Sequence, residues 1–95
     1  MTHPAVYMLA SARNGTLYTG VTSDLVKRVG QHKSHAIPGF TRWHLVDRLV
    51  WFEAHSTMES AIRREKAIKE WKRAWKLDLI ERSNAEWKDL FSSIT

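Results

Sequence analysis

The chain has 95 residues, 43% of them hydrophobic, and its 15 Lys and Arg against 10 Asp and Glu give a net charge of +5. This length predicts a single domain over residues 1–95 with enough apolar residues for a core. The sequence has no cysteine, which excludes disulfides and thiolate metal sites. Because we find no signal-peptide pattern and no window approaching ~18 apolar residues, we expect a cytoplasmic protein with no membrane partner.

The first predicted elements are two strands, over 5–10 and 17–22, each rich in β-branched and aromatic residues. Asn14-Gly15 lies between them and is typical of a two-residue hairpin turn in which both residues have positive φ. Such a turn pairs Tyr7 with Thr22 across the strands.

The whole pattern, β-β-α-β-α-α, predicts a small α+β domain with a three-stranded antiparallel sheet flanked by helices. The second strand leads into a helix capped by Thr22 or Ser23, with Asp24 in its first turn and its end near residue 34. The later predicted elements are a loop over 34–44, a strand over 45–55, a helix from a capping box at 56–59 to about 71, a helix over 73–82, and an apolar tail with Trp87, Leu90 and Phe91.

Seven of the fifteen basic residues lie between positions 63 and 76, and this cluster predicts a polyanionic partner, most often nucleic acid. A solvated helix surface is the alternative, since Lys and Arg favour such surfaces in any case. The residues that we expect to contact nucleic acid are Arg42, Arg63, Arg64, Lys66, Lys69, Lys72 and Arg73.

Three polar residues interrupt the apolar stripes of the predicted helices. Arg28 and His32 lie on the inner stripe of the first helix, and Glu65 lies on that of the 58–71 helix. Each alone could be a hydrogen-bonded core residue or part of a buried ion pair. Three of them in one small basic domain favour an active site, which needs desolvated titratable groups gathered together. The apolar residues expected beside Glu65 are Met58, Ala61, Ile62 and Ile68.

Tyr7 and Tyr18 are further candidates for this active site. With the two-residue turn, both side chains leave the same face of the sheet, four residues apart along the strand, or about 13 Å. Gly20 lies between them and leaves room above the sheet. A half-buried strand aromatic is the alternative role for either tyrosine.

These residues, in this order, resemble the GIY-YIG nuclease superfamily, in particular its small stand-alone bacterial members. The two signature elements stand here as Val6-Tyr7-Met8 and Tyr18-Thr19-Gly20. Arg28 follows the second tyrosine by ten residues, and His32 comes one turn later. Glu65 matches the family's glutamate within RREKAIKEWKR, and the segments GFTRWHLVDRLVWFE and NAEW are also similar, so that the resemblance covers nearly the whole chain.

The resemblance implies an endonuclease that hydrolyses DNA phosphodiester bonds with one divalent metal ion, Mg²⁺ or Mn²⁺. Glu65 would hold the metal, and Arg28 would grip the phosphate oxygens. Tyr18 would orient or deprotonate the attacking water, and His32 and Tyr7 would complete the catalytic group. The family often carries an asparagine after the glutamate, and Asn84 is the candidate here.

Two alternatives stay open at this point. The domain could be a nucleic-acid-binding module with weak or no catalysis, or a protein-interaction domain built on its five tryptophans. We expect a preference for single-stranded or structured DNA, because Phe40 and Trp43 lie beside basic residues and aromatic side chains stack on unpaired bases.

Overall fold

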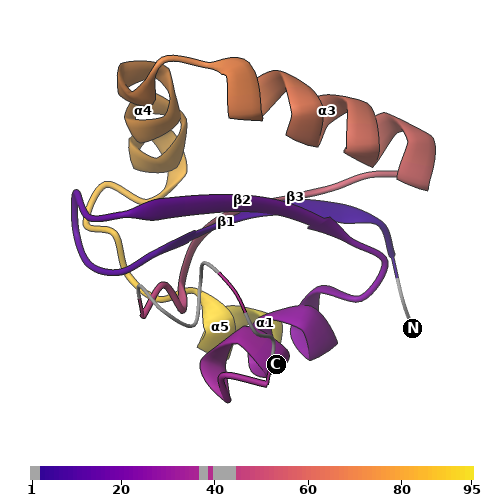
Figure 1. The fold of residues 1–95 in the computed structure, drawn as a ribbon, viewed down its shortest axis with the longest axis horizontal. Coiled ribbons are helices and arrows are strands. Elements are labelled where there is room, and N and C mark those ends of the chain that lie inside the picture. The colour runs from indigo at the N-terminus through magenta and orange to yellow at the C-terminus, as the bar shows by residue number, and fades with distance from the viewer. Residues whose placement is uncertain (1–2, 37–38, 40–44) are drawn as a thin grey trace.

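The computed structural model describes residues 3–36, 39 and 45–95 (Figure 1). Its sheet is antiparallel with strand order β2-β1-β3, which confirms the predicted α+β class. Most of the expected loop over 34–44 lies outside the described residues, and none of the described helices has the length and apolar content of a membrane span. The elements are β1 (Ala5–Ala10), β2 (Leu17–Thr22), α1 (Leu25–Lys33), β3 (Arg48–Ala54), α3 (Met58–Glu70), α4 (Arg73–Ser83) and α5 (Phe91–Ile94).

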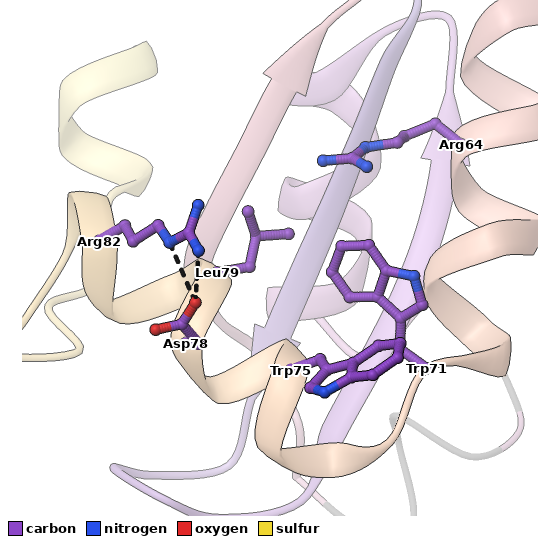
Figure 2. A pocket seen from close by; sticks show the side chains of 6 residues that line it. All are labelled: Arg64, Trp71, Trp75, Asp78, Leu79 and Arg82. Carbon is purple, nitrogen blue, oxygen red and sulfur yellow. Dashed lines mark hydrogen bonds and ion pairs between the residues drawn. The ribbon is translucent and has the colours of Figure 1, made fainter.

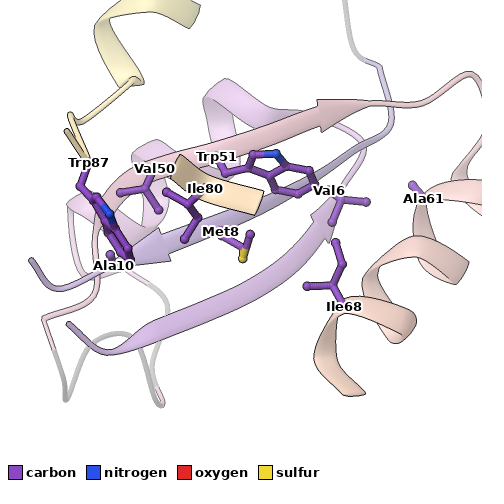
Figure 3. Close-up of a cluster of buried hydrophobic side chains, with 9 residues drawn as sticks. All are labelled: Val6, Met8, Ala10, Val50, Trp51, Ala61, Ile68, Ile80 and Trp87. Atoms are coloured by element: carbon purple, nitrogen blue, oxygen red, sulfur yellow. The ribbon is translucent and has the colours of Figure 1, made fainter. Parts of the chain in front are cut away.

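Helices cover both faces of the sheet, with α3 and α4 on one side and α1 and α5 on the other (Figure 1). Since β1 is the central strand, all six of its residues are buried. Its side chains alternate between the two faces. Val6, Met8 and Ala10 join the α3/α4 core (Figure 3), whereas Tyr7 and Leu9 join the α1/α5 core.

The register of the β1–β2 hairpin differs from the predicted one by two residues. Tyr7 pairs with Gly20 rather than Thr22. The turn spans four residues, 12–15, closed by a hydrogen bond from the Gly15 amide to the Ala12 carbonyl, and only Asn14 within it has a positive φ. Because side chains alternate with a period of two, this shift leaves every side chain on its predicted face.

The helix boundaries differ from the predicted ones by small amounts. Asp24 is itself the N-cap of α1, where it accepts from the Lys27 amide, and is not part of the first turn. Thr57 caps α3 by accepting from the Ser60 amide. On α3, Ala61 and Ile68 are buried, but Met58 and Ile62 are each 37% exposed, so the buried stripe is narrower than expected.

The C-terminal segment holds the two faces of the sheet together. A bulge in β3 inserts Val50 between the residues that pair with Met8 and Leu9. Asn84, buried after the end of α4, donates its side-chain amide to the Val50 and Lys88 carbonyls and accepts from the Lys88 amide. Trp87 then fills the α3/α4 core, while the residues after it, Leu90 and Phe91, pack in the α1/α5 core.

We expect Asn84→Ala to lower the free energy of unfolding by about 2–3 kcal/mol, because it leaves buried backbone groups without partners. Chemical denaturation measures this loss, with Ser83→Ala as the exposed neighbouring control. A variant as stable as the wild type would show that the Asn84 bonds do not anchor the tail.

Candidate active site

Four of the predicted site residues come together on the α1 side of the sheet. The Tyr7 hydroxyl lies 3.0 Å from His32 Nε2, and both residues are buried. The ring centroid of Tyr18 lies 6.2 Å from that of Tyr7 and 5.4 Å from that of His32. The Arg28 guanidinium lies near enough to the Tyr7 hydroxyl to oppose the rise in its pKa. The inner stripe of α1 therefore faces the two tyrosines, as its sequence predicts.

Gly20 makes this arrangement possible. It is the cross-strand partner of Tyr7, and a Cβ at position 20 would lie 2.5 Å from the Tyr7 hydroxyl oxygen. The phenol ring lies across β2 in the space that any other residue would fill. The tyrosines are consequently two residues apart along the paired strands rather than four, which is why their rings approach so closely.

Burial determines the protonation of this cluster. Desolvation, reinforced by Tyr18, raises the pKa of Tyr7 to about 12, against the opposing effect of Arg28. Desolvation, with a further contribution from the Arg28 charge, lowers the pKa of His32 below 6.5. At neutral pH Tyr7 is therefore a protonated hydroxyl, and His32 is a neutral imidazole.

Arg28 connects the buried cluster to the surface. It lies on the wall of an open cleft of about 430 Å³ at the start of α1. The cleft is polar, and its other lining residues are Thr22, Ser23, Asp24, Lys27 and Gln31. Lys27 and Gln31 were not predicted from the sequence, although their helical spacing places them beside Arg28. An anion that enters this cleft meets one guanidinium that also reaches Tyr7.

The model of the GIY-YIG catalytic domain matches residues 3–78 of this chain. The chain belongs to the GIY-YIG family.

The relatives of this GIY-YIG chain are small proteins of similar length. UPF0213 protein SAG0778 of Streptococcus agalactiae is 32% identical over 83 residues, or 87% of this chain and 94% of that protein. A UPF0213 protein of Haloquadratum walsbyi is 38% identical over 66 residues, or 70% and 74% of the two chains. The solution NMR structure of UPF0213 protein BH0048 from Bacillus halodurans superposes with a TM-score of 0.56, at 31% identity over 94% of this chain and 93% of that one.

The glutamate of the GIY-YIG pattern lies on a different layer from the tyrosines. Glu65 belongs to α3, which packs on β1 and β2 from the face opposite α1 (Figure 1). Its side chain is 13% exposed and forms an ion pair with Lys69 at 3.0 Å. Two other glutamates on this side of the sheet form ion pairs of their own: Glu53 binds His55 and Arg64, and Glu59 binds Arg63.

Among the described residues, the candidate metal ligand is the single carboxylate of Glu65. No group of three or more His, Cys, Asp or Glu side chains that could hold a metal ion gathers in residues 3–36, 39 and 45–95. Glu65 as a single carboxylate suits Mg²⁺, which keeps several water ligands and also takes substrate phosphate oxygens.

The predicted nucleic-acid contacts divide into two groups. Four make contacts within the protein: Arg63 with Glu59, Arg64 with Glu53, Lys69 with Glu65, and Arg73 with the Asn14 and Gly15 carbonyls. Lys66 and Lys72 are exposed and pair with no other described residue. Exposed ion pairs contribute about 0–1 kcal/mol, so Arg63 can exchange its carboxylate partner for a phosphate at little cost. Arg42 lies outside the described residues.

Asn84 has a structural role in this chain. All its side-chain contacts are with backbone groups of β3 and of the tail.

His32 should make the stability of the protein depend on pH. Its pKa is lower in the folded state than in the unfolded chain, so the unfolded chain binds the proton more tightly. The free energy of unfolding should therefore decrease as the pH falls below about 6.5, and His32→Gln should show a smaller decrease than the wild type. Denaturant unfolding at several pH values measures this, with exposed His3→Gln as the control. Equal pH slopes in all three proteins would contradict the assignment.

Proposed function

We propose that this protein is a metal-dependent endonuclease that hydrolyses DNA phosphodiester bonds at the cluster of Tyr7, Tyr18, Arg28 and His32. One observation carries the proposal: Arg28 lines an open polar cleft and acts on the buried Tyr7 hydroxyl by opposing the rise in its pKa, and that hydroxyl itself contacts His32. This arrangement puts an anion-binding group at the entrance to a buried chain of proton-transfer groups. Membership of a nuclease family supports the same reaction class.

Arg28 binds the scissile phosphate in this mechanism. Its planar guanidinium can donate two parallel hydrogen bonds to the non-bridging oxygens and stabilise the charge that develops on them. Lys27, on the wall of the same cleft, adds positive charge beside the substrate backbone.

The tyrosines and His32 handle the proton of the attacking water. The water oxygen forms a new bond to phosphorus while the bond to the leaving sugar oxygen breaks. Tyr18, the more exposed of the two tyrosines, would face this water, and its ring lies 6.2 Å from that of Tyr7, whose hydroxyl contacts His32. Each hydroxyl passes on a proton as it receives one, so Tyr7, with a pKa near 12, never has to become a phenolate. Neutral His32 takes the proton and later returns it to solvent or to the leaving oxygen.

Glu65 would hold the metal ion. A bound Mg²⁺ or Mn²⁺ would supply Lewis-acid stabilisation of phosphate charge and of the leaving oxygen. Because Glu65 and Arg28 lie on opposite faces of the sheet, the substrate would have to reach both faces. Within the protein, Glu65 would exchange its ion pair with Lys69 for the metal, and the freed ammonium would then be available to a substrate phosphate.

The proposed function is tested by incubating end-labelled single-stranded, duplex and branched DNAs with the protein, with Mg²⁺ or Mn²⁺ and with EDTA. Cleavage that requires the metal and is lost in Tyr18→Phe supports it. DNA binding without cleavage of any substrate would overturn it in favour of a binding module.

Arg28→Lys should lose most of the cleavage activity, about a hundredfold in kcat, because an ammonium cannot fork onto two phosphate oxygens. Arg13→Lys in the exposed β1–β2 turn is the matched control and should retain wild-type turnover. If the Arg28→Lys enzyme turns over normally, only the positive charge at this position matters.

Glu65→Gln should abolish metal-dependent cleavage while DNA affinity stays within a few-fold of wild type. Its melting temperature without metal should stay equal to or above that of the wild type, because the lost pair with Lys69 contributes only about 0.3–0.5 kcal/mol and the amide is easier to desolvate. Cleavage assays in Mg²⁺ and thermal unfolding in EDTA measure the two effects, with exposed Glu70→Gln on the same helix as the control. Wild-type cleavage by the Glu65→Gln protein would show that the metal is held elsewhere, and a melting point several degrees lower would show that Glu65 is needed for folding.

A further inference from the structure

A second cleft lies on the other side of the sheet, between α3 and α4 (Figure 2). Its volume is about 530 Å³, within the range of small-ligand sites. None of its lining residues belongs to the tyrosine cluster. The lining residues are Arg64, Trp71, Trp75, Asp78, Leu79 and Arg82.

Of the two tryptophans in this cleft, Trp71 packs against the core and Trp75 is largely exposed. Trp71 is half-buried and packs against the α3/α4 core. Trp75 is 56% exposed, and its ring meets that of Trp71 edge-on, with centroids 6.2 Å apart. Large exposed aromatic side chains often mark a binding surface. The exposed ring of Trp75 offers a flat apolar surface to a planar partner.

Charged groups around the tryptophans are held in place. The Arg64 guanidinium lies 5.3 Å from the centre of the Trp71 ring and is bonded to Glu53. Arg82 is paired with Asp78, the acidic residue of the lining (Figure 2). The lining of the cleft therefore has two arginines and one aspartate, and Arg64 is also paired with Glu53 outside the lining.

The surrounding surface is also basic. Lys72, Arg73 and Lys76 lie where α3 passes into α4, and the segment from 63 to 76 carries seven basic residues and two glutamates. An anionic occupant is therefore favoured over a neutral or cationic one. A nucleotide unit combines the two features that this surface can recognise, a planar base and a phosphate.

We propose that this cleft binds one unpaired nucleotide of a single-stranded DNA, with its base stacked on Trp75 and its phosphate near Arg82 and Lys72. The inference rests on the proposed nuclease function and adds a second contact point for the same substrate. The cleft thereby gives the protein a hold on the strand that is separate from the cleavage site.

The positions of the two sites explain why the strand should be unpaired. The cleft belongs to the α3/α4 side of the sheet and the tyrosine cluster to the α1 side, in a molecule only 30 × 28 × 25 Å in extent. One strand that reaches both must bend sharply around the sheet. Duplex DNA has a persistence length of about 150 base pairs and resists such a bend, whereas a single strand follows it easily.

The test compares Trp75→Ala and Trp75→Phe with the wild type for binding of a fluorescein-labelled 20-nucleotide oligo(dT) and of a duplex of equal length. Binding is measured by anisotropy in EDTA, so that no cleavage is required. Met58→Ala is the control, because Met58 is an exposed apolar residue of α3 outside the cleft. Thermal unfolding checks that each variant is folded. Because Trp75 is 56% exposed, its replacement removes little packing.

Loss of one stacked base lowers affinity by about tenfold. We expect Trp75→Ala to weaken oligo(dT) binding by about tenfold and duplex binding by less than twofold, with Trp75→Phe and Met58→Ala close to wild type. Unchanged oligo(dT) affinity in Trp75→Ala, or an equal loss for duplex, would overturn the inference. Because binding is measured without metal, an inactive wild-type protein that shows the Trp75 effect would overturn only the nuclease proposal. If the wild-type protein cleaves DNA but Trp75→Ala binds oligo(dT) normally, only the proposed nucleotide site in the cleft is overturned.

Discussion

The hydrogen bond between the Tyr7 hydroxyl and His32 depends on the central position of β1. A central strand is covered on both faces, so a tyrosine there has its hydroxyl removed from water and needs a partner. His32 supplies that partner from α1, and Gly20 supplies the space across which the ring reaches it. The same burial that makes the bond necessary raises the pKa of Tyr7 and lowers that of His32. Packing thus keeps Tyr7 protonated and His32 neutral at neutral pH.

The grouping of the two tyrosines with Arg28 and His32 could be predicted from the sequence because it follows from the helical and strand periods. Helical spacing aligns Arg28 with His32, and strand alternation puts Tyr7 and Tyr18 on one face. The position of Glu65 on the opposite face of the sheet was not predicted. The register was predicted wrongly because Asn14-Gly15 suits both a two-residue turn and the four-residue turn observed. An error of two residues preserves the face but doubles the separation, so the approach of the two rings could not be predicted.

Contacts between elements that are distant in the sequence were harder to predict than the helices and strands themselves. The apolar residues Met58 and Ile62 look like core in the sequence, yet α3 sits across a narrow sheet and buries mainly Ala61 and Ile68. The ion pairs within the basic cluster depend on helical neighbours and on a strand that the helix crosses, such as Glu53 for Arg64. The exposure of Trp75 likewise follows from the angle between α3 and α4, which composition does not specify.

The segment after α4 makes contacts that hold α1, the helix that carries two residues of the candidate active site. The match to the GIY-YIG domain ends at residue 78, but Lys33 at the end of α1 pairs with Asp89 and lies over the ring of Phe91. Asp89 also accepts from the Leu49 amide, so this contact joins α1 to β3 as well as to the tail. Since α1 carries both Arg28 and His32, a shift of this helix would separate them from Tyr7. A nine-residue helix is too short to be stable by itself, and its position must come from such tertiary contacts. The residues beyond the family match therefore belong to the machinery that positions the candidate active site.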